Sequence, residues 1–185
     1  MNQEEKAAKA NSLKEHGITT FRYGEYEEAT EVFEEAHTLY GELGDRKGQA
    51  EMLNNLGAVH TQEERWDDGL EAFTQARSIF ESLDDKEGEA QTLGNLGTLY
   101  RYQGDKAAAV EHLKQAIDLF HEVGDREKEA ATLRLVSRIG LGQARWFEAL
   151  HFYDLSLACA APQGIKARIL RRLLQIPLNL LSRPQ

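Results

Sequence analysis

Residues 90–125 decide the fold, and they read AQTLGNLGTLYRYQGDKAAAVEHLKQAIDLFHEVGD. In the first half of this stretch, Leu93, Leu96 and Tyr100 recur every three or four residues. This is the spacing of one face of an α-helix. Apolar residues between 110 and 120 repeat the same spacing, and a Gly-Asp pair stands between the two halves. The stretch therefore predicts two antiparallel helices that are joined by a short turn.

The same pattern recurs along the chain at a spacing of 40 residues, without an insertion. Three of the shared registers are Ala10, Ala50, Ala90 and Ala130; Leu13, Leu53, Leu93, Leu133 and Leu173; and Gly17, Gly57 and Gly97. Self-similarity at a fixed spacing indicates stacked structural repeats. We expect a single domain over residues 1–185, with repeats at about 10–49, 50–89, 90–129 and 130–163 and a capping half-repeat at 164–185.

The apolar periodicity and the turn residues also predict where each helix lies. The expected helices cover roughly 3–22, 25–42, 46–62, 66–82, 86–102, 106–122, 126–142, 146–160 and 165–176. Gly44 and Gly124 suit left-handed helix ends. Asp45, Asp85 and Asp125 suit the N-cap of the next helix.

Three of the repeated glycines fall in the middle of expected helices, where glycine costs about 1 kcal/mol relative to alanine. Close approach of the paired helix would offset this cost. We expect the small residues on the other side to be Ala36, Ala76 and Ala116, which share a register of their own.

The residues of the third repeat resemble a known family. Leu-Gly-Thr-Leu-Tyr at 96–100, followed by Gly104, Ala109, Leu113 and Ala116, resembles the tetratricopeptide repeat. The Asn-Leu-Gly and Gly-Asp elements at a 40-residue period are similar to the branch with Pins-type modulators, kinesin light chains and bacterial peptide-sensing regulators. The resemblance covers about residues 10–176. It implies an all-α fold, a right-handed α-solenoid of about four helix-turn-helix units plus a C-terminal capping helix, that serves as a protein-interaction scaffold.

Composition and charge narrow the function further. The chain has 22 Lys and Arg against 31 Asp and Glu, so its net charge is −9 and its pI is near 5.2. An acidic chain of this kind lacks the basic footprint of a nucleic-acid-binding protein. Neither a bilayer-spanning stretch nor a signal-peptide pattern is present. We expect a cytoplasmic protein that contacts neither nucleic acid nor membranes.

Residue patterns typical of enzymes are absent from the sequence. The histidines form no His-Glu-x-x-His motif, and the glycines form neither a phosphate loop nor a dinucleotide-binding fingerprint. A single cysteine excludes a multi-cysteine zinc site. Cys159 shares a register with Leu39 and Leu119, which indicates a core residue rather than a nucleophile. Trp66 and Trp146 are interpreted as packing rather than binding residues. We expect a protein that is not an enzyme and needs neither cofactor nor metal.

The resemblance implies that the first helices of successive repeats line a concave groove. Carried over by register, the expected groove residues are Lys14, Arg22, Asn54, Asn55, Asn95, Arg101, Arg134, Arg138 and Arg171. Six of these side chains are cationic, and the same registers hold only two acids, Glu15 and Glu51. A positive field on an acidic chain steers an anionic ligand into the groove, and arginine matches carboxylates in geometry. The alternative is that these arginines only pair with neighbouring acids such as Glu89, Glu127 or Glu129.

Asn55 and Asn95 occupy one register in adjacent repeats. A side-chain amide both donates and accepts, so it can bind a peptide backbone whatever its sequence. These residues therefore predict a protein partner that presents an extended, acidic peptide segment. The alternative function is a self-associating structural module, which includes a homo-oligomer or one segment of a longer array.

The tail matches the register of a fifth first helix over residues 165–176. A terminal repeat needs a polar outer face, which Lys166, Arg168, Arg171 and Arg172 supply. The alternative is a basic amphipathic helix that lies on an anionic membrane.

Overall fold

The computed structural model describes residues 1–159. Within that range the chain forms eight α-helices and no strand. They are α1 (Gln3–Tyr23), α2 (Tyr26–Leu43), α3 (Arg46–Gln62), α4 (Trp66–Ser82), α5 (Lys86–Gln103), α6 (Lys106–Val123), α7 (Arg126–Leu141) and α8 (Trp146–Cys159). From the start of α1 to the start of α8, the helix ends agree with the expected ones to within one residue. The expected helix over 165–176, with Arg171 and the rest of the capping half-repeat, lies outside the described residues.

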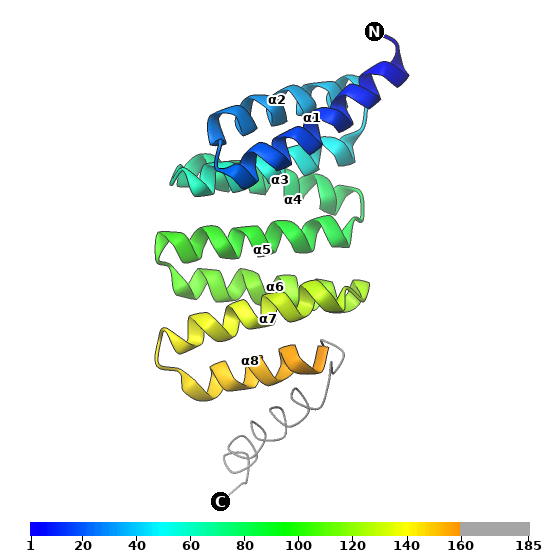
Figure 1. Ribbon diagram of the computed structural model, residues 1–185. Helices are drawn as coiled ribbons and strands as arrows, with labels where there is room; N and C mark the ends of the chain where they lie inside the picture. Colours follow the sequence, from blue (N-terminus) through cyan, green and yellow to red (C-terminus); the bar gives the residue numbers. More distant parts are fainter. Residues whose placement is uncertain (160–185) are drawn as a thin grey trace, which may run out of the picture.

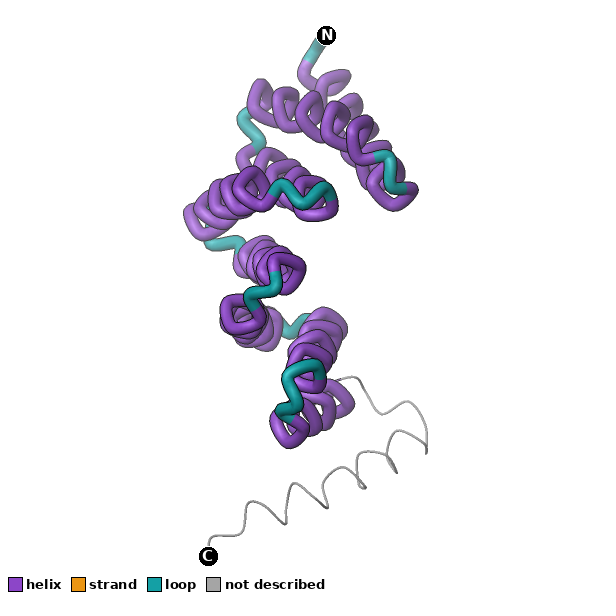
Figure 2. The backbone as a smooth tube through the Cα atoms, turned by 90° about the vertical axis from the view of Figure 1, so that its left-hand side faces the viewer, coloured by secondary structure: helices purple, strands orange, loops and turns teal. Residues whose placement is uncertain are grey.

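The helices are stacked one after another, so that α1 lies at one end of the described structure and α8 at the other (Figure 1). Each helix packs mainly against its neighbours in sequence, and α3 also contacts α5. The helix axes change direction along the stack. In Figure 2 the middle helices are seen end-on, whereas the N-terminal helices α1 and α2 are seen at an angle to them. This arrangement confirms the expected all-α solenoid.

The mid-helix glycines allow close packing within each repeat, but onto different residues from those expected. A Cβ atom added at Gly17 would lie 2.5 Å from the ring of Phe33, and one at Gly97 would lie 2.6 Å from Cγ of Leu113. The expectation of facing alanines was therefore wrong. The facing side chains are large and buried, so the missing Cβ makes room for them. The residues opposite Gly17, Gly57 and Gly97 are Phe33, Phe73 and Leu113.

Helix ends are fixed by the residues that the sequence singled out. The side chains of Asp45, Asp85 and Asp125 each accept a backbone N–H bond of 2.9 Å at the start of α3, α5 and α7. A carboxylate in this position satisfies an N–H group that the helix leaves unpaired. Gly44 and Gly124 end α2 and α6 with φ of 71° and 78°. These caps set the start of each first helix and therefore the register of its side chains.

The two tryptophans differ in their surroundings. Trp66, at the start of α4, packs against the core cluster that contains Phe73 and Leu93. Trp146, at the start of α8, is 58% exposed. The packing interpretation is therefore confirmed for Trp66 and wrong for Trp146.

Candidate functional site

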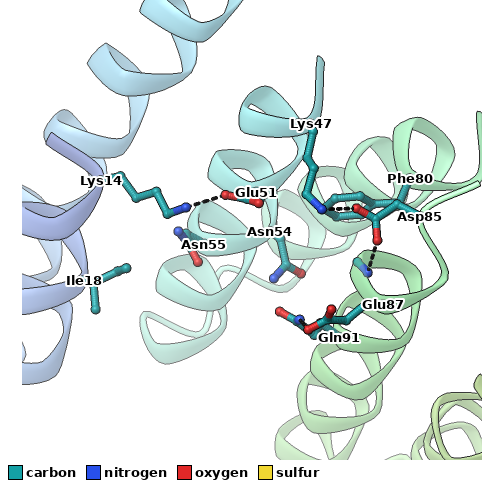
Figure 3. A pocket seen from close by; sticks show the side chains of 11 residues that line it. Lys14, Ile18, Lys47, Glu51, Asn54, Asn55, Phe80, Asp85, Glu87 and Gln91 are labelled. Carbon is teal, nitrogen blue, oxygen red and sulfur yellow. Dashed lines mark hydrogen bonds and ion pairs between the residues drawn. The ribbon is translucent and has the colours of Figure 1, made fainter. Parts of the chain in front are cut away.

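Three cavities follow the first helices of the repeats and together form one groove. The first has a volume of about 290 Å³ and lies among α1, α3 and α5 (Figure 3). The second, of about 320 Å³, and the third, of about 250 Å³, lie between α5 and α7. Gln91 lines the first two cavities, and Leu135 lines the second and third. The shared residues make the groove continuous.

Most of the expected site residues line this groove. Lys14, Asn54 and Asn55 line the first cavity, Asn95 lines the second, and Arg101 and Arg138 line the third. Arg134, on α7, and Arg22, in the last turn of α1, are exposed and line none of the three cavities. Arg171 lies outside the described residues.

The first cavity has its charges paired within the protein. Nζ of Lys14 lies 2.5 Å from Oε2 of Glu51, and Nζ of Lys47 lies 2.6 Å from Oδ2 of Asp85 (Figure 3). Burial by itself lowers the pKa of Lys14, but the hydrogen bond and the negative charge of Glu51 outweigh it and raise that pKa. Lys14 is therefore charged, and its charge is neutralised by α3.

The asparagines are partly bonded to each other across α3 and α5. Nδ2 of Asn95 donates to Oδ1 of Asn54 over 3.1 Å. The shared register had placed Asn55 rather than Asn54 beside Asn95. Asn55 is half-buried and makes no hydrogen bond of its own among residues 1–159. Asn95 keeps its carbonyl oxygen and its second N–H for a ligand, because an amide has two donors and one acceptor oxygen.

The region between α5 and α7, which we call the α5–α7 gap, differs from the first cavity in its charges. Within residues 1–159, the lysines and arginines that form no ion pair are Arg22, Arg46, Arg101, Lys106, Arg134 and Arg138. The last four belong to α5, α6 and α7, and three of them, Arg101, Lys106 and Arg138, line the third cavity. The gap is also wider, because α5 and α7 approach each other less closely than α3 and α5 do.

None of the three acids that could have neutralised these arginines pairs with them in the described part of the chain. Glu89 accepts from Arg77 at 3.2 Å. Glu129 is buried and pairs with Arg126 at 3.1 Å and with His121 at 3.0 Å. Glu127 forms no ion pair with the described residues. The alternative in which the groove arginines pair with these acids is therefore wrong within residues 1–159.

The third cavity contains one cation that the sequence analysis missed. Lys106 begins α6, so a search restricted to first helices passes over it, although it stands five residues after Arg101 across the Gly-Asp turn. The guanidinium of Arg101 lies 4.3 Å from the ring centre of Tyr102, a cation–π contact. Nε of Arg101 is buried and has no hydrogen-bond acceptor in the described part of the chain.

Metal ligands or a reactive cysteine would mark a catalytic or metal centre along residues 1–159. No group of three or more His, Cys, Asp or Glu side chains there could hold a metal ion. Burial, together with the hydrogen bond to Glu129, raises the pKa of the half-buried Cys159 thiol. A protonated thiol is a poor nucleophile. No helix in this range is long and apolar enough to cross a membrane.

Comparison with known families agrees with this geometry. Residues 48–122 match the tetratricopeptide repeat. This stretch runs from α3 to α6 and includes part of the first cavity and part of the second. Residues 48–122 therefore carry the tetratricopeptide repeat. No curated protein matches it in sequence.

Solved structures share the fold at low sequence identity. Aspartyl phosphate phosphatase F from Bacillus subtilis is 16% identical, with a TM-score of 0.79 over 91% of this chain. TPR-like repeats of a candidate kinesin light chain from Podosopora anserina are also 16% identical, with a TM-score of 0.67 over 92% of this chain and 91% of that one. BtubC (BKLC) from P. vanneervenii is 18% identical, with a TM-score of 0.63 over 95% of this chain. This chain spans 44% of the phosphatase and 66% of BtubC.

Proposed function

We propose that the protein is a non-catalytic interaction scaffold that binds an extended, acidic peptide segment of a partner in its groove. The observation that carries this proposal is the position of the unpaired cations. Three of them, Arg101, Lys106 and Arg138, line the third cavity, and Arg134 lies exposed on α7, although the whole chain has a net charge of −9. A local field opposite to the global charge draws an anionic ligand to that part of the groove.

The groove also provides for the backbone of such a peptide. Asn55 lines the first cavity with its amide unbonded, and Asn95 retains one N–H and its carbonyl oxygen. Contacts from these amides are independent of the peptide's side chains. The asparagines therefore hold any extended segment, and Arg101, Arg134 and Arg138 select an acidic one.

The expected affinity follows from the number of contacts. A neutral hydrogen bond contributes about 0.5–1.5 kcal/mol and a charge-assisted one about 1.5–3 kcal/mol. Ordering a flexible peptide offsets much of this sum. Five such contacts give a dissociation constant on the order of micromolar.

Fluorescence anisotropy with two labelled peptides tests the proposal. One probe alternates glutamate with small residues, and the other has lysine in place of every glutamate. We expect the acidic probe to bind and the basic probe not to bind. Equal affinity for both probes, or binding of neither, would refute the proposed function.

Two matched variants distinguish binding in the groove from a general effect of the protein's charge. Arg138→Glu and Arg46→Glu each reverse one exposed arginine that has no ion pair, but only Arg138 lines the groove. Arg138→Glu should weaken the acidic probe at least tenfold, because one charge-assisted contact becomes a repulsion. Arg46→Glu should change the affinity less than threefold. Similar losses in both variants would place the binding site elsewhere.

A second candidate function is self-association, and exposed apolar side chains favour it. Leu141, Trp146 and Phe147 flank the turn between α7 and α8 and are 42%, 58% and 55% exposed. Neighbouring exposed apolar side chains are typical of interaction surfaces. Sedimentation velocity over a range of concentrations tests this function. A dimer that dissociates in Trp146→Gln would support it, and a monomer at all concentrations would refute it.

A further inference from the structure

The third cavity combines three cations with an apolar wall. It is lined by Arg101, Lys106 and Arg138 and by Leu135, Ile139 and Gly142. Ile139 is buried and Leu135 is half-buried. Charges beside an apolar wall interact more strongly with a ligand than the same charges in open water. The cavity therefore suits a compact anion better than the open surface does.

None of the three cations is neutralised by the elements that surround it. The acids of α5 and α7 lie in the first turns of those helices, away from the cavity. Asp105, which stands between Arg101 and Lys106 in sequence, uses Oδ1 to accept the backbone N–H groups of Ala107 and Ala108 and forms no ion pair within residues 1–159. Three positive charges thus face one cavity of about 250 Å³.

Arg101 adds an independent sign of a missing acceptor. Its Nε is buried without a hydrogen-bond partner in the described chain, and its guanidinium lies over the Tyr102 ring. Buried polar groups nearly always have a partner, so an orphaned donor in a cationic cavity calls for an explanation. An anion with several acceptor oxygens supplies one.

We propose that this cavity binds a phosphoryl group that is carried on a side chain of the peptide in the groove. This inference rests on the proposed function and names the anion that the α5–α7 gap recognises. A carboxylate has one negative charge and two oxygens. A phosphorylated side chain carries about −1.5 to −2 at pH 7 and three acceptor oxygens. It therefore matches two guanidinium groups and one ammonium in both charge and number of acceptors.

Three peptides of the same acidic sequence test the inference, with a central phosphoserine, glutamate or serine. Isothermal titration should give at least tenfold tighter binding for the phosphoserine peptide than for the glutamate peptide, because charge-assisted contacts are added. In the double variant Lys106→Gln, Arg138→Gln, this preference should fall below threefold. The control Arg46→Gln removes a charge from an exposed arginine without an ion pair, and it should keep the preference.

An NMR measurement distinguishes a phosphoryl group on a peptide from free inorganic phosphate. The Nε–H signal of Arg101, assigned by its loss in Arg101→Lys, should shift on titration with the phosphoserine peptide and not with the serine peptide. Inorganic phosphate is titrated separately as the free source.

The outcomes distinguish this inference from the proposed function. Acidic peptides that bind with equal affinity with and without phosphate, and leave the Arg101 signal unmoved, would overturn the phosphoryl site and leave the proposed function standing. A shift with inorganic phosphate when no peptide binds would overturn the peptide as the source and the proposed function together. A phosphoserine preference that survives the Lys106, Arg138 double variant would overturn the assignment to this cavity.

Discussion

The first cavity and the α5–α7 gap are formed by equivalent helices of different repeats, but their charged side chains differ in pairing. In the first cavity, Lys14 is paired with Glu51, and Lys47 is paired with Asp85. In the α5–α7 gap, Lys128 bonds Glu87 near the helix starts, and the arginines farther along have no acid partner. The difference teaches that equivalent registers can serve stability in one repeat and remain available to a ligand in the next.

The largest expected effect is the loss of peptide affinity when the unpaired arginines of α7 are reversed in charge. The double variant Arg134→Glu, Arg138→Glu should weaken an acidic peptide about 100-fold or more, because two charge-assisted contacts of about 1.5 kcal/mol or more are lost. Lys14→Gln should weaken the same peptide less than threefold, since Glu51 already neutralises Lys14. Isothermal titration measures both. A larger loss in Lys14→Gln than in the double variant would reverse the comparison.

Substitution of two glycines of α5 should change stability in opposite directions, because one glycine is packed and the other faces the second cavity. Gly97→Leu should destabilise the fold by about 1–3 kcal/mol, because an added side chain meets Leu113 and the backbone oxygen of Ala109. Gly94 lines the second cavity, and an added Cβ there meets nothing within 4 Å. Gly94→Ala should therefore stabilise the helix by up to about 1 kcal/mol. Chemical denaturation measures both, and equal stabilities would contradict the packing account.

Much of this fold could be predicted because each unit repeats the previous one at a fixed spacing. The N-cap aspartates and the left-handed glycines mark helix ends in the sequence itself, which is why the expected bounds from α1 to the start of α8 were correct to one residue. The residues opposite the mid-helix glycines were predicted wrongly. Apolar periodicity identifies the buried face of a helix, but it does not show which residue of the partner helix contacts that face. Phe33 and Leu113 reach Gly17 and Gly97 from three positions before the expected alanines.

The groove was predicted less completely than the fold. Register placed Asn95 and Arg138 along it, but the partner of Asn95 is Asn54, which depends on how α3 and α5 are turned relative to each other. The pairing of Lys14 with Glu51 depends on side-chain conformations as well. Lys106 was missed because it belongs to a second helix.

A smaller effect is expected on stability, where the paired Lys14 can be compared with the unpaired Arg138. Lys14→Met leaves Glu51, whose side chain is 31% exposed, without its cation. We expect a loss of about 1 kcal/mol, the upper range for an ion pair near the surface. Arg138→Met removes no ion pair and should leave the free energy of unfolding unchanged within about 0.5 kcal/mol. Urea denaturation of both variants decides the point. A larger loss in Arg138→Met would mean that its charge is used within the fold.

The smallest expected effect concerns pH and compares a histidine in each half. Burial lowers the pKa of His37 in α2, and burial together with Arg77 lowers the pKa of His112 in α6 against the opposing charge of Glu111. Both groups are neutral above their ordinary pKa of 6.5. As the pH falls below that value, the unfolded chain binds protons that the folded chain does not, so stability decreases.

His112→Phe isolates one of these contributions, since repeat four has Phe152 at this register. The variant should lose less stability than the parent between about pH 7 and pH 5.5, because only the parent's unfolded state gains a proton at this position. Thermal melts at the two pH values measure the difference. His37 remains in both proteins as an internal control. Identical pH dependence would show that His112 is not protected from protons by the fold.

The central claim is that an acidic ligand occupies the groove and is selected at the α5–α7 gap. The most direct measurement is a ¹H–¹⁵N NMR titration of the full chain with the alternating glutamate probe. We predict shifts of the side-chain amides of Asn55 and Asn95 and of the Nε–H groups of Arg101 and Arg138, with the signals of Arg46 and Arg65 unmoved. Shifts confined to α2, α4 and α6, with the groove amides unchanged, would contradict the account.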